Sequence, residues 1–168
     1  MNATQKKCLV LIFGFYAILL TAYVLGFRWN RTRSLQPGIY RLVNGAIQRD
    51  GYARVAPNAS EWYRMGVERE YYREGTPLLK KIIALEGDVV SYDMIEKGLI
   101  IGETTFILLS EIRSKDSAGR DMSMPSFPIR LKPGEAWLGS ENERGYDSRY
   151  FGPVSMDLLQ PARLVWGW

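Results

Sequence analysis

The stretch Pro77-Leu-Leu-Lys-Lys-Ile-Ile-Ala-Leu85 has the composition of a β-strand, and it sets two lysines inside an aliphatic pattern. Side chains alternate between the two faces of a strand, so Lys80 lies in one file and Lys81 in the other. Whichever face points to the core, one lysine therefore stands among aliphatic neighbours. The alternative is an edge strand from which both lysines extend into water.

A lysine buried among aliphatic side chains can act as a general base. Desolvation disfavours the ammonium form and lowers a lysine pKa from about 10.4 by several units, so the neutral amine can act as a general base. The chain has no histidine and only one cysteine, Cys8. This excludes Ser-His-Asp triads, Cys-His dyads, intrachain disulfides and metal centres built on histidine or thiolate clusters. We expect no cofactor and no metal.

The sequence around this stretch predicts a mainly β fold. Its 168 residues suffice for one domain with a core. Apolar and β-branched pieces separated by Gly, Pro, Asp and Asn predict short strands. These strands are expected at 39–43, 52–55, 78–85, 89–92, 99–101, 105–109, 136–139 and 164–166. We expect a single compact, barrel-like or folded sheet.

Two further local elements are predicted. A helix is expected over 61–73, with Asn58 or Ser60 as its cap, and a shorter one is possible around 156–159. The tripeptide Glu86-Gly87-Asp88, between two apolar runs, predicts a hairpin turn.

Residues 8–26 contain no charged side chain, which predicts a membrane helix. As a helix they span about 28 Å, close to the hydrocarbon thickness of a bilayer. The alternatives are a buried core helix and a cleaved secretory signal with Lys6 and Lys7 as its basic region. We expect an uncleaved anchor in segment 1–27 and a folded domain over 28–168.

The distribution of charge agrees with an anchor. Residues 1–33 hold five basic and no acidic side chains, whereas the remainder holds 17 basic and 18 acidic ones. Nucleic-acid binding needs a basic folded surface, so we expect no nucleic-acid partner and a membrane-lipid partner instead. Basic residues flank the apolar run on both sides, so the positive-inside rule leaves the orientation open.

Ser34 is the second candidate for chemistry. Pro37-Gly38 makes a tight turn that leaves Ser34 in irregular backbone just after the apolar run. A hydroxyl there can be a nucleophile if a base reaches it. The ordinary alternative is a serine that only makes turn hydrogen bonds.

At this point the chain resembles the type I signal peptidases, which are membrane-bound Ser-Lys endopeptidases, and especially their conjugative-transfer branch, TraF. The resemblance runs from the anchor to about Trp166, with its motifs in the family's order. They are Ser34-x-x-Pro37, Lys80-Lys81-x-x-x-Leu85-x-Gly87-Asp88, Asp116-x-x-Gly119-Arg120, Gly139-Ser140-x-Asn142 and Asp147-Ser148-Arg149-Tyr150-Phe151-Gly152-Pro153.

The resemblance implies roles for individual residues. Ser34 would be the nucleophile and Lys80 the general base, with Lys81 its non-catalytic neighbour. Thr32 would join the Ser34 N–H in the oxyanion hole. Support for the lysine strand is expected from Asp147, Ser148 and Arg149, although an ordinary surface ion pair is the alternative for Asp147 and Arg149.

One departure from the family pattern concerns the lysine's partner. Relatives usually have a serine two positions before the aspartate, where it hydrogen-bonds the lysine, and this chain has Gly145. We therefore expect Ser140, Ser148 or a water molecule to orient the amine.

The resemblance implies cleavage of the signal or propeptide of an exported protein, expected to be a conjugative pilin, with cyclisation as a second outcome. It implies a bacterial inner-membrane protein with its domain in the periplasm and contacts to conjugation machinery. The alternatives are a housekeeping signal peptidase with broad preprotein substrates, and a non-catalytic, membrane-tethered assembly factor.

Overall fold

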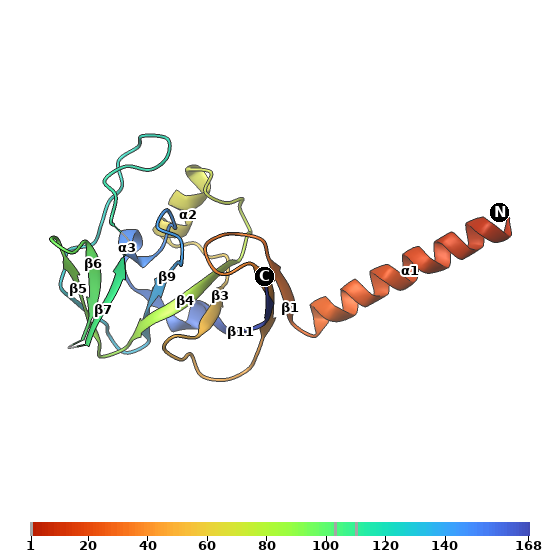
Figure 1. The fold of residues 1–168 in the computed structure, drawn as a ribbon, viewed down its shortest axis with the longest axis horizontal. Helices are drawn as coiled ribbons and strands as arrows, with labels where there is room; N and C mark the ends of the chain where they lie inside the picture. Colours follow the sequence, from red (N-terminus) through yellow and green to blue (C-terminus); the bar gives the residue numbers. More distant parts are fainter. Residues whose placement is uncertain (1, 103, 110) are drawn as a thin grey trace.

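Figure 1 shows the structure, a computed structural model that describes residues 2–102, 104–109 and 111–168. A β-rich body carries one long helix that leads away from it. The helices are α1 (Ala3–Val24), α2 (Glu61–Glu68), α3 (Ser148–Phe151) and the 3-10 turn η1 (Met156–Leu158). The strands are β1 (Phe27–Asn30), β2 (Gly38–Leu42), β3 (Tyr52–Val55), β4 (Leu78–Leu85), β5 (Val89–Asp93), β6 (Gly98–Ile101), β7 (Thr104–Leu109), β8 (Ile129–Arg130), β9 (Glu135–Gly139), β10 (Val154–Ser155) and β11 (Leu159–Gly167). The predicted mainly β class is confirmed.

The strands form two antiparallel sheets. The larger sheet curls into a half-barrel with the order β1-β2-β11-β3-β4-β9-β10, and the smaller has the order β7-β6-β5-β8. Strand β11 pairs with both β2 and β3, and Ala162 lies opposite Leu42 on one side and Tyr52 on the other. This strand therefore fixes the hairpin of β1 and β2 relative to β3 and β4.

Two apolar clusters stabilise this arrangement. One joins the two sheets and is made of Ile83, Ala84, Val90, Leu99, Ile101, Leu131 and Trp137. The other lies on the larger sheet and is made of Ala53, Val55, Ile82, Leu138 and Val154, with Trp62 of α2 and Phe151 of α3 packed against it. Since β4 contributes to both clusters, its position is set from two sides.

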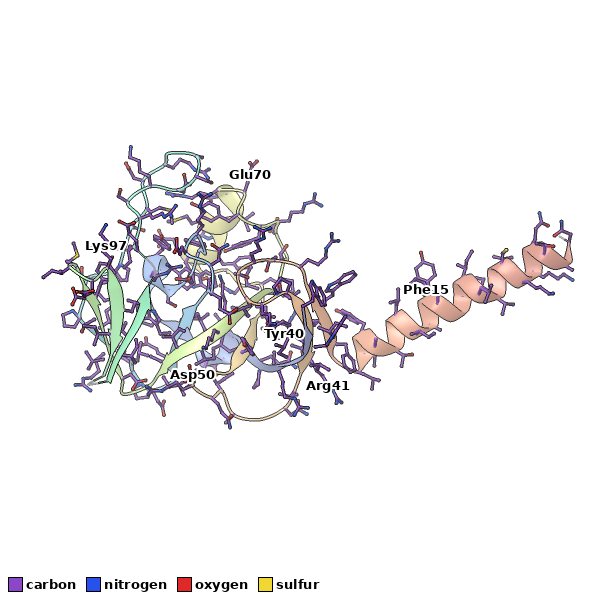
Figure 2. The ribbon with its side chains drawn as sticks, in the orientation of Figure 1. Phe15, Tyr40, Arg41, Asp50, Glu70 and Lys97 are labelled. Atoms are coloured by element: carbon purple, nitrogen blue, oxygen red, sulfur yellow. The ribbon has the colours of Figure 1, made fainter. Side chains whose placement is uncertain are left out.

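Helix α1 is long and apolar enough to cross a bilayer, with a mean hydropathy of 2.0 in its most apolar window, and none of that window is buried. Figure 2 shows Phe15 projecting from α1 away from the rest of the protein. The alternative of a buried core helix is therefore wrong. Asn2 caps the first turn by accepting a hydrogen bond from Gln5 N at 2.9 Å.

The turn at Glu86-Gly87-Asp88 is not a hairpin. Strand β4 belongs to the larger sheet and β5 to the smaller one, so the turn carries the chain from one sheet to the other. Gly87 adopts a positive φ of 86°, which lets the chain change direction there. The prediction of a turn is confirmed, but the local sequence does not determine which strands pair across it.

The helix predicted over 61–73 ends at Glu68. Glu70 has a φ of 59°, and the ring of Tyr72 packs directly over Gly66, where a side chain would clash. The aromatic pair at 71–72 is thus folded back against the helix instead of extending it. The cap is Ser60, whose N–H donates to Asn58 Oδ1.

Several strands were missed or underestimated. Strand β11 runs over Leu159–Gly167 although only 164–166 was predicted, and β1, β8 and β10 were not predicted. The first half of β11 was missed because Pro161 lies within it, and a proline normally argues against a strand. The short helix expected near 156–159 is the single turn η1.

Candidate active site

Lys80 is buried inside the protein. It lies on β4 between β3 and β9, opposite Ala53, with only 5% of its surface exposed. Its neighbour Lys81 points to the other face, where its side chain is 25% exposed and pairs with Asp50 at 3.5 Å. Because β4 is not an edge strand, the edge-strand alternative is wrong.

The Lys80 amine is held by two hydrogen bonds. Nζ donates to Ser140 Oγ at 2.8 Å and to the carbonyl oxygen of Tyr146 at 2.7 Å. Burial lowers the pKa of Lys80 to about 8. The charges of Asp147 and Arg149 act in opposite directions on that pKa, the first raising and the second lowering it. A fraction of the amine is therefore neutral near physiological pH.

Asp147 and Arg149 form a buried ion pair, so the alternative of a surface pair is wrong. They are 0% and 2% exposed, and Arg149 donates from Nε to Asp147 Oδ1 and from Nη2 to Asp147 Oδ2, both at 2.8 Å. Burial by itself lowers the pKa of Arg149, but the bonds and charge of Asp147 outweigh it and raise that pKa. Arg149 therefore remains charged in this pair.

This pair shapes the loop that carries the lysine's acceptors. Arg149 also donates to the backbone carbonyls of Asn142, Glu143 and Gly145. Ser148 Oγ accepts from Leu138 N at 2.9 Å and ties the same loop to β9. Asp147, Ser148 and Arg149 thus hold the segment from which Ser140 and Tyr146 reach Lys80.

Ser140 takes the place that a side chain at 145 would fill. A Cβ added to Gly145 would overlap both Cβ and Oγ of Ser140. Of the three candidates for the lysine's partner, Ser140 makes the hydrogen bond, whereas the Ser148 hydroxyl is turned to β9.

Ser34 lies partly exposed on the loop between β1 and β2. Its Oγ lies 2.9 Å from Thr32 Oγ1, and Thr32 Oγ1 in turn donates to Asn30 Oδ1 at 2.7 Å. Since the single Thr32 proton goes to Asn30, Ser34 is the donor in the bond to Thr32. Among the hydrogen bonds of the described residues there is none that joins Ser34 directly to Lys80.

Asn30 organises this loop, and the sequence reasoning gave it no role. It is buried, and its Nδ2 donates to the carbonyl oxygens of Thr32, Leu35 and Gln36. Its Oδ1 accepts from both the N–H and the hydroxyl of Thr32. The signal was available, because an asparagine two residues before a threonine at a turn is typical of an Asx turn.

The two halves of the site are joined by consecutive residues. Ser140 binds Lys80, and Glu141 N donates to the Ser34 carbonyl at 2.7 Å. The Glu141 carboxylate also accepts from Gln36 N at 2.8 Å. No local sequence pattern points to Glu141, because its contacts join positions more than a hundred residues apart.

Ser34, Thr32 and Lys80 line one cavity of about 970 Å³. Gly145 and Tyr146 form part of the same wall, and the loop that follows β7 contributes Asp116 and Met122. The structure therefore brings the predicted nucleophile, the predicted base and the predicted oxyanion residue to one hollow. Asp147, Ser148 and Arg149 lie behind that wall.

Comparison with known proteins agrees with this arrangement. The model of the signal peptidase family, peptidase S26, matches residues 4–166, so the chain belongs to that family. It is a peptidase by family, and the predicted resemblance is confirmed.

Named relatives match almost end to end. A conjugal transfer protein TraF of Agrobacterium fabrum is 28% identical over 96% of this chain and 97% of its own length. A plasmid transfer protein TraF of Escherichia coli is 28% identical over 90% of this chain and 89% of its own. The crystal structure of a signal peptidase I from Enterococcus faecalis aligns with a TM-score of 0.44 and 20% identity, covering 72% of this chain and 99% of that one.

Proposed function

We propose that this chain is a membrane-anchored serine endopeptidase in which Ser34 is the nucleophile and Lys80 the general base. The observation that carries the proposal is the buried Lys80 amine, with its pKa lowered to about 8, on the wall of the cavity that Ser34 also lines. A neutral amine beside an alcohol can supply the proton acceptor that histidine supplies elsewhere. The family match supports peptide hydrolysis as the reaction.

The chemistry begins with a change of hydrogen bond. Ser34 gives up its bond to Thr32 and donates to Lys80 Nζ, which takes the proton as Ser34 Oγ bonds to the scissile carbonyl carbon. The Ser34 N–H and the Thr32 hydroxyl stabilise the oxyanion, and Thr32 must turn its proton away from Asn30 to do so. As the C–N bond breaks, the lysine passes its proton to the leaving amine.

The acyl-enzyme is then resolved by a second nucleophile. Lys80 takes a proton from that nucleophile and passes it to Ser34 Oγ as the ester C–O bond breaks. Attack by water gives a free carboxyl group, whereas attack by the amino terminus of the substrate gives a cyclic product. The hydrogen bonds that Nζ donates to Ser140 Oγ and to the Tyr146 carbonyl oxygen keep the amine in place through both steps.

The substrate is the signal or propeptide of an exported protein, and a conjugative pilin fits the names of the relatives, which are conjugal and plasmid transfer proteins. On this proposal, segment 1–27 lies in the bacterial inner membrane and the domain over 28–168 lies in the periplasm beside the conjugation machinery. The length and apolar composition of α1 support the membrane anchor. The non-catalytic alternative rested on Gly145, and the Ser140 hydroxyl weakens it because it supplies the missing hydrogen bond.

The experiment compares processing of several exported proteins by the full-length chain in bacterial membranes. A conjugative propilin and unrelated preproteins are each co-expressed with the chain or with its Ser34→Ala variant, and product masses are measured. We expect propilin to be cut only by the unchanged chain. Cutting of every preprotein would favour a housekeeping enzyme, and equal cutting by Ser34→Ala would refute the proposed nucleophile. The product mass also separates a linear from a cyclic product.

A further inference from the structure

The cavity that holds Ser34 and Lys80 is strongly cationic. Besides Lys80, six basic side chains line it, whereas Asp116 is the one acidic residue among its described lining residues. The six are Arg28, Arg31, Arg54, Arg113, Lys115 and Arg144. Residues 34–168 as a whole hold 17 basic and 18 acidic side chains, so this concentration of positive charge belongs to the cavity and not to the domain as a whole.

The negative charge of Asp116 is already compensated by neighbouring arginines. Burial by itself raises the pKa of Asp116, but hydrogen bonds from Tyr71 and Arg120 outweigh it and hold that pKa well below its usual range. Arg69 approaches the same carboxylate at 3.8 Å. Asp116 therefore leaves no charge to compensate the other lining cations.

Those cations have few carboxylate partners of their own. Arg113 and Lys115 reach Glu143 and Asp121 only at 3.8 and 3.9 Å, on exposed side chains. Within the described residues, Arg54 and Arg144 form no ion pair, and the Nε of Arg54 is buried without a hydrogen-bond acceptor. Arg49, which lies outside the cavity, is by contrast closely paired with Asp88 at 2.6 Å.

The cations also come from segments that lie far apart in the fold. Arg28 and Arg31 follow α1 directly, whereas Arg113 and Lys115 belong to the connection after β7. Figure 1 shows this connection rising beside α2, away from α1, and hydrogen bonds from Arg69 and Tyr71 attach it there. An extended peptide that reaches the catalytic serine would therefore have basic groups along its path.

We propose that the cavity selects a peptide carrying carboxylate side chains near the bond to be cut. This inference rests on the proposed peptidase function and names the chemistry of its substrate. Carboxylates would neutralise the lining cations and supply acceptors for guanidinium groups such as that of Arg54. The charge also predicts faster association with acidic substrates and a strong dependence of binding on salt.

The test measures binding, so that it does not depend on cleavage. Full-length Ser34→Ala protein in neutral detergent is titrated with a fluorescent Ala-rich peptide containing three glutamates, and with a twin containing three glutamines. We expect the glutamate peptide to bind about tenfold more tightly at low salt, and the difference to shrink near 0.5 M salt. Equal binding of the two peptides would overturn the inference.

Matched variants locate the effect. Arg54→Gln and Arg144→Gln should each weaken the glutamate peptide about three- to tenfold and leave the glutamine peptide unchanged. Arg64→Gln removes the same charge from the exposed face of α2, outside the cavity, and should change neither. If Arg64→Gln weakened binding of the glutamate peptide equally, the preference would follow from the net charge of the protein and not from the cavity, and the inference would be wrong.

Anionic lipid is the competing ligand for the same cations. If phosphatidylglycerol in nanodiscs displaces the glutamate peptide, and only Arg28→Gln and Arg31→Gln abolish the displacement, the cavity is a headgroup site and the inference fails. Acid-selective binding without any processing by the unchanged chain would instead refute the proposed function and leave the binding inference standing.

Discussion

The loop that carries Ser34 and the pocket that holds Lys80 are built in opposite ways. The pocket is a product of the core: β4 is packed on both sides, and a buried ion pair fixes the loop around the amine. The loop is partly exposed and is shaped by one side chain, Asn30, and two bonds to Glu141. The proposed base is thus fixed in place, whereas the proposed nucleophile lies where a peptide can reach it and where its hydroxyl can turn.

The largest expected effect comes from removing either chemical group. Ser34→Ala and Lys80→Met should each lower kcat/KM by about a thousandfold or more, because nucleophile and base act as a unit. Lys81→Met, one position along the same strand but on its opposite face, should retain most activity. Cleavage of a fluorogenic peptide by detergent-solubilised protein measures all three, and equal losses for Lys80→Met and Lys81→Met would contradict the assignment.

Breaking the buried pair should affect stability more than any change in the exposed loop. Asp147→Asn leaves the Arg149 charge uncompensated, which should cost about 3–5 kcal/mol. Thermal unfolding followed by circular dichroism measures the loss. Asp157→Asn, on the exposed turn η1, is the control. A Tm for Asp147→Asn within a degree of the unchanged protein would show that the pair does not hold the pocket.

A substitution in the loop that carries Ser34 should lower activity more than it lowers stability. Asn30→Ala removes the donor to three carbonyls and the acceptor for Thr32, so we expect a loss of about 10- to 100-fold in kcat, with about 1–3 kcal/mol of stability. Asn44→Ala, on an exposed stretch, should be neutral in both. A variant at Asn30 that is unstable but fully active when folded would contradict a positioning role.

Ser140 gives the smallest and most specific effect. Ser140→Ala should lower kcat about tenfold, because Lys80 loses one acceptor but keeps the Tyr146 carbonyl. Gly145→Ser alone should also be harmful, since its side chain overlaps Ser140. The double change Ser140→Gly with Gly145→Ser moves the hydroxyl to the neighbouring position and should recover activity. If the double variant is no more active than either single variant, the hydroxyl at position 145 does not replace the one at position 140.

The sequence predicted features that depend on local pattern. Alternation within β4 predicted one buried lysine of the two, with an exposed edge strand as the alternative, and the uncharged run at 8–26 predicted α1. Family resemblance, not the pattern, selected Lys80. The contacts of Ser140 and Glu141 could not be predicted, because they depend on how β9 ends beside the loop after β1. The true end of α2 was missed for the same reason, since it depends on Tyr72 packing over Gly66.

The central claim is that the Lys80 amine works in its neutral form, and the pH dependence of kcat/KM tests it most directly. A lysine with a pKa of about 8 is protonated below that pH, so activity should fall about tenfold per pH unit on the acid side. Asp147→Asn removes a charge that raises this pKa and should move the acid limb to lower pH. Activity that stays constant from pH 9 to pH 6 would contradict a lysine base.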